Sequence, residues 1–102
     1  MVIYTEAVLE LFKRSHMDAA RALDNWYNEA EDANWIKPED VRKPGGKVRV
    51  KGRKARANIR GKRYRLLFTV GYKSGRVYLI DFLPHKEYNR YNNIWEDHKW
   101  YR

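Results

Sequence analysis

The stretch over residues 56–88 constrains the fold most, because it holds two hairpin turns between three strand-like runs. Small apolar residues alternate with basic and polar ones over residues 55–60, and apolar residues alternate again over residues 64–70. A period of two is typical of strands with one buried face. Gly61-Lys62 and Ser74-Gly75 separate the runs, and glycine supplies the positive φ that tight hairpin turns need. The stretch therefore predicts an antiparallel sheet.

Helices are predicted to cover one face of this sheet. The third run, residues 77–83, is apolar on both faces except at Asp81, which is typical of a central strand covered by helices. Apolar residues at helical spacing over residues 7–12 and 19–30 predict two helices joined almost without a loop. Thr5 is the expected N-cap of the first helix, and Ser15 with Asp18 resembles a capping box that opens the second.

We therefore expect a single α+β domain over residues 1–102. It consists of an N-terminal helical hairpin packed on a mainly antiparallel sheet of about four strands, with a short C-terminal helix and a loose tail after it. Residues 2–4 can add a short strand, and residues 47–54 are predicted to be a strand or an extended arm.

Positive charge is concentrated in the middle of the chain. The net charge is +9, yet residues 1–40 carry nine acidic and four basic side chains. Residues 41–80 carry fourteen basic side chains and no acidic one. Such a patch attracts polyanions, so a nucleic acid is the expected partner, although a solvated basic surface is the simpler alternative.

Several other classes of protein are not expected. The chain has no cysteine, no apolar run of the roughly 20 residues that a membrane span needs, and no signal peptide pattern. It also has no glycine-rich phosphate loop, and His16, His85 and His98 lack metal-ligand spacing. We expect a cytoplasmic protein with no metal, no cofactor and no membrane partner.

The basic stretch ends at His85-Lys86-Glu87-Tyr88, where side chains suited to RNA cleavage come together in the sequence. Histidine exchanges protons near neutral pH, arginine stabilises phosphate charge, and tyrosine stacks on bases or donates a hydrogen bond. Attack of a 2′-hydroxyl on its own phosphodiester needs an acid, a base and cations. The alternative is that the histidine, which follows a proline, is only a turn residue.

Two segments of the chain carry a resemblance to a known family. They are Lys62-Arg63-Tyr64-Arg65-Leu66-Leu67-Phe68 and Val77-Tyr78-Leu79-Ile80-Asp81-Phe82-Leu83-Pro84-His85-Lys86-Glu87-Tyr88. Their pattern resembles the HigB branch of the RelE toxin superfamily over about residues 55–91. That branch has a similar Tyr-Arg-Leu strand start, a Val-Tyr-Ile-Arg strand and a His-Ala/Lys-Glu-Tyr cluster. Asp81 departs from it, because a basic residue is common there.

The resemblance implies a RelE-like fold and a toxin that cleaves mRNA, typically on the translating ribosome. It implies a HigA-like helix-turn-helix antitoxin as the partner that holds the toxin inactive. It also implies roles for three residues: Arg65 binds phosphate, His85 is the acid or base, and Tyr88 orients a base or phosphate. Glu87 is either a proton carrier or a cap of the last helix.

The remaining candidates are basic residues expected to bind RNA. They are Lys54, Arg56, Arg60, Lys62, Arg63 and Lys86, of which the first three follow from charge and strand position alone. Two other functions stay open. The chain can be a non-catalytic RNA- or DNA-binding module, such as a small ribosome-associated protein, or a superfamily member without activity.

Overall fold

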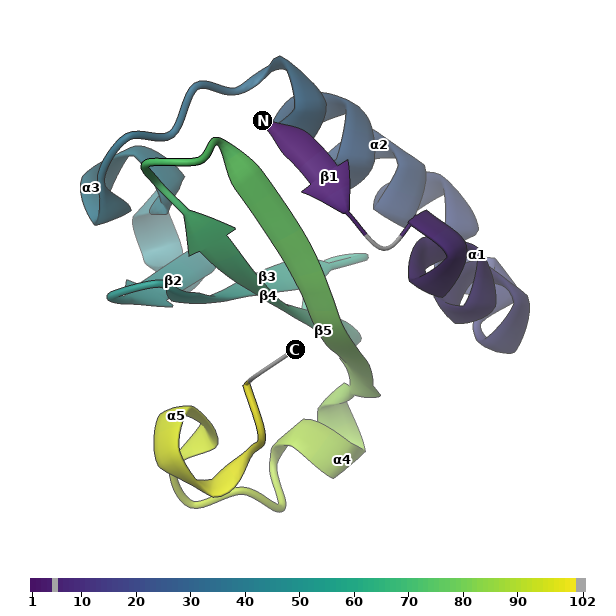
Figure 1. The fold of residues 1–102 in the computed structure, drawn as a ribbon. Coiled ribbons are helices and arrows are strands. Elements are labelled where there is room, and N and C mark those ends of the chain that lie inside the picture. The colour runs from purple at the N-terminus through teal and green to yellow at the C-terminus, as the bar shows by residue number, and fades with distance from the viewer. Residues whose placement is uncertain (5, 101–102) are drawn as a thin grey trace.

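The computed structural model describes residues 1–4 and 6–100. The elements are β1 (Val2–Tyr4), α1 (Glu6–Ser15), α2 (Ala20–Asp32), α3 (Pro38–Val41), β2 (Val48–Lys51), β3 (Lys54–Ile59), β4 (Tyr64–Gly71), β5 (Arg76–Pro84), α4 (His85–Tyr88) and α5 (Ile94–Asp97) (Figure 1). Thr5, the expected N-cap of α1, lies outside the described residues. Within the described part of the chain, no helix has the length and apolar character to cross a membrane.

The described strands form one sheet of five, in the order β1-β5-β4-β3-β2. Neighbours pair antiparallel except β1, which runs parallel to β5 at one edge. The predicted α+β architecture and mainly antiparallel sheet are confirmed, but the sheet has one strand more than expected. The possible strand over residues 2–4 is confirmed as β1, an edge strand paired with β5.

The helical hairpin covers one face of the sheet (Figure 1). Phe68 of β4 is fully buried in this core, with the Trp26 ring of α2 5.0 Å from its own. Leu66 and Val70 flank Phe68 at period two, as the sequence predicts, and Leu23 lies on the buried stripe of α2. These are the residues whose spacing defined the strand and the helix, so burial of their apolar surface stabilises both elements together.

A bulge in β5 decides which way Asp81 points. Leu67 pairs with Asp81 while Phe68 pairs with Leu79, so one extra residue, Ile80, is inserted between the two pairs. Leu79 and Phe82 therefore both pack in the helix-side core, and Ile80 packs in a second cluster on the other face. Bulges re-aim side chains in this manner. Asp81 thus faces the side of the sheet that the helical hairpin leaves open.

The expected capping box at Ser15 is wrong. His16 is the N-cap of a 3-10 turn over Met17–Ala19, without a side-chain cap. The Asp18 carboxylate accepts a hydrogen bond of 2.7 Å from the Tyr64 hydroxyl and pairs with Arg60. A charged partner offers a carboxylate a stronger hydrogen bond than a backbone amide does, so tertiary contacts take precedence over the local cap.

These contacts predict a pH-dependent stability. The Tyr64 hydroxyl and Arg60 lower the pKa of Asp18 from its ordinary value of 3.8. Because the folded pKa is depressed, Asp18 stabilises the fold above its unfolded pKa, and this stability is lost as the pH falls through the folded pKa. We expect Asp18→Asn to lower the urea midpoint near neutral pH and to match wild type in strong acid. A midpoint difference that stays constant with pH would contradict this assignment.

Candidate active site

The C-terminal segment covers part of the sheet face opposite the helical hairpin (Figure 1). Leu67 of β4 and Leu83 of β5 form a second hydrophobic cluster with Ile94 and Trp100, and Tyr88 packs against it. Trp100 is only 7% exposed. The expected loose tail is therefore wrong through Trp100, because its apolar residues find an apolar patch that the local sequence does not reveal.

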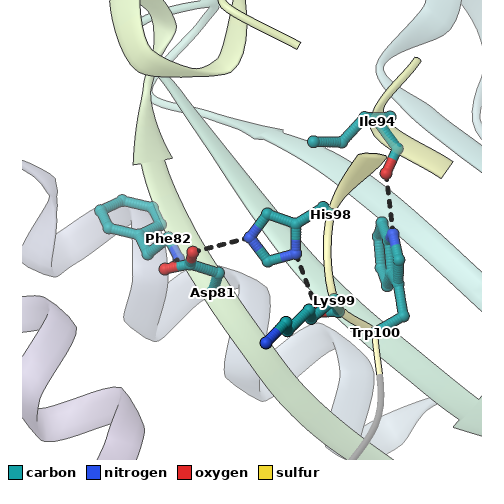
Figure 2. A network of polar contacts seen from close by, with 6 residues as sticks. All are labelled: Asp81, Phe82, Ile94, His98, Lys99 and Trp100. Carbon is teal, nitrogen blue, oxygen red and sulfur yellow. Dashed lines mark hydrogen bonds and ion pairs between the residues drawn. The ribbon is translucent and has the colours of Figure 1, made fainter. Parts of the chain in front are cut away.

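Hydrogen bonds tie this segment to β5 and to itself (Figure 2). His98 Nε2 lies 2.9 Å from Asp81 Oδ2, and His98 Nδ1 lies 2.8 Å from the Lys99 carbonyl oxygen. Both partners are hydrogen-bond acceptors. The Trp100 indole N–H donates to the Ile94 carbonyl at 2.9 Å. Asp81, the departure from the family pattern, thus anchors the tail.

Removal of the buried indole tests this docking. We expect Trp100→Ala to lower the free energy of unfolding by about 3 kcal/mol, the usual cost of deleting a large core aromatic side chain. Met17→Ala is the control, since Met17 is 78% exposed and its loss should change stability by less than about 0.5 kcal/mol. Urea denaturation measures both. If Trp100→Ala unfolds at the wild-type midpoint, the tail is not docked in solution.

Two arginines flank the Tyr88 ring on this face. The Cζ atoms of Arg65 and Arg56 lie 5.1 and 5.8 Å from its centre, within cation–π distance. Each arginine is only 6% exposed. Arg65 Nη1 donates to the Lys62 carbonyl at 2.7 Å, and Arg56 Nη2 donates to the Gly46 carbonyl. The buried Nε of each arginine has no hydrogen-bond partner among the described residues.

The electrostatics of the pair favour an anion. Burial lowers the pKa of Arg56, and the charge of Arg49 lowers it further, although Tyr88 acts in the opposite direction. Burial also lowers the pKa of Arg65, and the charge of Arg56 adds to that effect. Buried cations that repel one another are costly unless a negative charge compensates them. A phosphate is such a charge.

An open hollow of about 450 Å³ lies beside this cluster. It is lined by Arg49 and Arg56 of the sheet and by Tyr88, Tyr91, Asn92, Asn93, Ile94 and Trp95 of the C-terminal segment. Arginine, aromatic rings and side-chain amides are the groups that bind phosphates, stack on bases and read base edges. The docked tail therefore supplies one wall of a site whose other wall is the basic sheet.

Two other candidates, His85 and Lys86, lie at the start of α4. His85 is exposed, and its Nδ1 lies 3.1 Å from Nδ2 of the Asn89 side chain. It stands three residues before Tyr88, a spacing that places both side chains on the same side of a helical turn. Lys86 is exposed on the same helix. The His85 backbone N–H donates to the Arg63 carbonyl at 2.8 Å, which ties α4 to the turn between β3 and β4.

The structure does not bring all the predicted residues together. Arg56, Arg65 and Tyr88 form one cluster, and Lys62 and Arg63 lie exposed in the adjoining turn. Arg60 instead pairs with Asp18 of the helical hairpin. Lys54 Nζ donates to the Trp95 carbonyl at 2.6 Å and so supports the tail.

Arg49 and the tail residues that line the hollow were not predicted from the sequence. A signal existed for Arg49, because it alternates with Val48 and Val50 and therefore faces away from the helix-side core. Tyr91, Asn92 and Trp95 carried no such signal, since their position depends on the docking of the tail. Among the described residues, no group of three potential metal ligands converges on one point.

Comparison with known families adds an independent finding. A family model described as HigB_toxin, RelE-like toxic component of a toxin-antitoxin system, matches residues 19–91. No curated relative matches the chain. The matched region runs from the start of the second helix through the sheet to Tyr91, one of the residues lining the hollow. It confirms the resemblance over residues 55–91 and extends it to α2.

Proposed function

This chain belongs to the HigB family of RelE-like toxins, and on that premise we propose that it is an endoribonuclease that cleaves mRNA on the ribosome without a metal ion. As the toxic component of a toxin-antitoxin system it has an antitoxin for a partner. We propose a HigA-like helix-turn-helix protein for that role and the cytoplasm as the place where both act.

The observation that carries the proposal is the pair of buried arginines beside the hollow. Their Nε atoms have no hydrogen-bond partner among the described residues. Burial lowers the pKa of both arginines, and the charge of Arg49 acts on Arg56 and that of Arg56 on Arg65 in the same direction. A fold tolerates such an arrangement when a ligand compensates it, and strongly perturbed groups cluster at functional sites. A phosphodiester in the hollow would accept hydrogen bonds from Arg56 and neutralise the repulsion.

The proposed reaction uses the groups around this phosphate. A base removes the proton of the 2′-hydroxyl, the 2′-oxygen attacks the adjacent phosphorus, and the 5′-oxygen leaves with a proton from an acid. His85 is the exposed group able to exchange protons at neutral pH. Arg56 stabilises the added phosphate charge, and Arg65 adds positive charge and supports the Tyr88 ring. Tyr88 orients the phosphate or a neighbouring base.

Growth and cleavage assays test the proposal directly. Induction of the chain alone should arrest bacterial growth, and coexpression of the antitoxin, which should copurify with it, should restore growth. Purified toxin that has first been treated with a metal chelator should still cut mRNA on programmed ribosomes. If the protein binds ribosomes or RNA but leaves mRNA intact, it is a non-catalytic basic module instead.

RNA binding should depend strongly on salt. The fourteen basic residues over residues 41–80 meet no acidic residue in that segment. If about five phosphates are contacted, log K should fall against log salt with a slope of roughly −3.5 for single strands, because each contact releases condensed counterions. A filter-binding titration from low to high salt measures the slope. A flat response would show that binding is not carried by phosphate contacts.

A further inference from the structure

A second cluster of aromatic and basic side chains lies on the same face of the sheet, away from the hollow. The Tyr4 ring of β1 and the Tyr78 ring of β5 stack with their centres 5.3 Å apart and their planes 25° from parallel. The guanidinium of Arg76 lies over the Tyr4 ring at 5.1 Å. Tyr4 is 38% exposed, Arg76 is exposed and Tyr78 is half-buried, so the cluster reaches the solvent.

The pairing of the strands places this cluster on the face that carries the site. Tyr78 pairs with Thr69, and Thr69 lies two residues from Leu67, which packs under the C-terminal segment. Residues two apart in a strand share a face. The neighbours of Tyr4 and Tyr78, which include Ile3 and Leu79, point to the helix-side core instead.

One row of side chains links the cluster to the hollow. Across the five strands of the described sheet, Tyr4 pairs with Tyr78, Tyr78 with Thr69, Thr69 with Lys54, and Lys54 with Lys51. Neighbouring strands lie about 4.8 Å apart, so Tyr78 and Lys54 are separated by roughly 10 Å. The Lys54 amine in turn contacts the carbonyl of Trp95, which lines the hollow. A strand bound in the hollow could continue along this row.

These rings, Tyr4 and Tyr78, lie outside the hydrophobic clusters of the described residues. Exposed aromatic rings with arginine stack on unpaired bases, and they do so with little preference for sequence because every base has a π-face. The surrounding charge favours a polyanion over a protein, because residues 41–80 carry no acidic side chain.

We propose that Tyr4, Tyr78 and Arg76 form a stacking platform for unpaired bases of the RNA substrate that flank the cleavage site. The platform rests on the proposed function, because it takes the substrate to be RNA. It would extend the bound length beyond the nucleotides in the hollow and would tighten substrate binding without taking part in the reaction.

Oligonucleotides of two lengths separate the platform from the hollow. Fluorescein-labelled, 2′-O-methyl RNAs of about 12 and about 4 nucleotides cannot be cleaved by a 2′-hydroxyl, and only the longer one spans both sites. We expect Tyr78→Leu to weaken binding of the longer RNA by about 10-fold, within the range of one lost base–aromatic stack, and to leave the shorter one unchanged. Tyr78→Phe keeps the ring and should bind within about twofold of wild type.

The contribution of the Arg76 charge to RNA binding is tested with a matched pair of variants. Arg76→Gln should weaken the longer RNA selectively, while Arg21→Gln, which removes an exposed arginine from the helical side, should weaken it less. Circular dichroism checks that each variant is folded. Tyr4→Leu repeats the test on the neighbouring strand if Tyr78→Leu fails to fold.

The outcomes distinguish the platform from the proposed function. If wild type cleaves mRNA and Tyr78→Leu binds the longer RNA like wild type, the platform is wrong and the activity stands. If Tyr78→Leu weakens both RNAs equally, or disrupts the antitoxin complex with RNA binding intact, the platform is also wrong. If Tyr78→Leu weakens binding of the longer RNA only, but the wild type never cleaves mRNA, the platform is supported and the proposed activity is refuted. A wild type that binds neither RNA refutes both.

Discussion

His85→Ala is expected to slow mRNA cleavage by about 10²- to 10⁴-fold, the usual cost of losing a general acid or base. His85 is exposed at the start of α4, and its backbone is fixed by the hydrogen bond from its N–H to the Arg63 carbonyl. It precedes Tyr88 by three residues, and Tyr88 lines the hollow in which we place the phosphate. We therefore propose that the histidine reaches the reacting oxygens while remaining in contact with water.

The design of this experiment isolates proton transfer from folding and binding. Cleavage on programmed ribosomes measures the rate, and circular dichroism checks the fold. His85→Gln keeps a hydrogen-bonding side chain of similar reach but cannot exchange a proton at neutral pH, so it should be as slow as His85→Ala. Asn89→Ala removes the amide beside the ring and should cost far less. Cleavage by His85→Ala within about threefold of wild type would remove His85 from the mechanism.

Arg56→Ala and Arg65→Ala are each expected to slow cleavage by about 10²- to 10³-fold, because each removes a donor or charge that stabilises the phosphate in the transition state. The two guanidiniums both lie within cation–π distance of the Tyr88 ring, and both arginines are almost fully buried. A water-excluded charge acts more strongly than an exposed one, so these two of the fourteen central cations should have effects that the others lack.

Arg60→Ala is the matched control for the arginine pair. Arg60 follows β3 in the same basic stretch. Its guanidinium pairs with Asp18 of the helical side and not with the Tyr88 ring. The Arg60→Ala variant should therefore cleave mRNA at close to the wild-type rate. Since a buried arginine supports the fold as well, Arg56→Lys and Arg65→Lys are needed: they keep the charge but lose the planar group, and should be folded with intermediate rates.

A double variant tests whether the arginine and the histidine act on one transition state. Arg65→Ala with His85→Ala should lose less activity than the product of the two single losses, because groups that act as a unit are not additive. If the losses multiply, the two residues act independently. If both arginine variants cleave like Arg60→Ala, the phosphate is not bound at this cluster and the hollow is not the active site.

The sequence alone determined the hairpins and suggested the kind of chemistry to propose. Alternation of apolar residues and the turn glycines are local patterns, so β3, β4 and β5 follow from them directly. Histidine, arginine and tyrosine at the end of a basic sheet likewise predicted phosphate and RNA chemistry, which stays a prediction. The family pattern over residues 55–91 depends on these same local features, and the family match confirms it.

The tertiary structure decided which of these residues meet. The sequence shows that a residue is charged but not whether it is buried. It therefore does not distinguish Arg56, which lies close to the Tyr88 ring, from Arg60, which pairs with Asp18 of the helical hairpin. Residues 91–95 enter the site only because Ile94 and Trp100 dock on a distant apolar patch. The bulge at Ile80 turns Asp81 toward His98 and completes that docking. Each of these contacts joins residues far apart in the chain, and their pairing depends on register and packing, which no local pattern encodes.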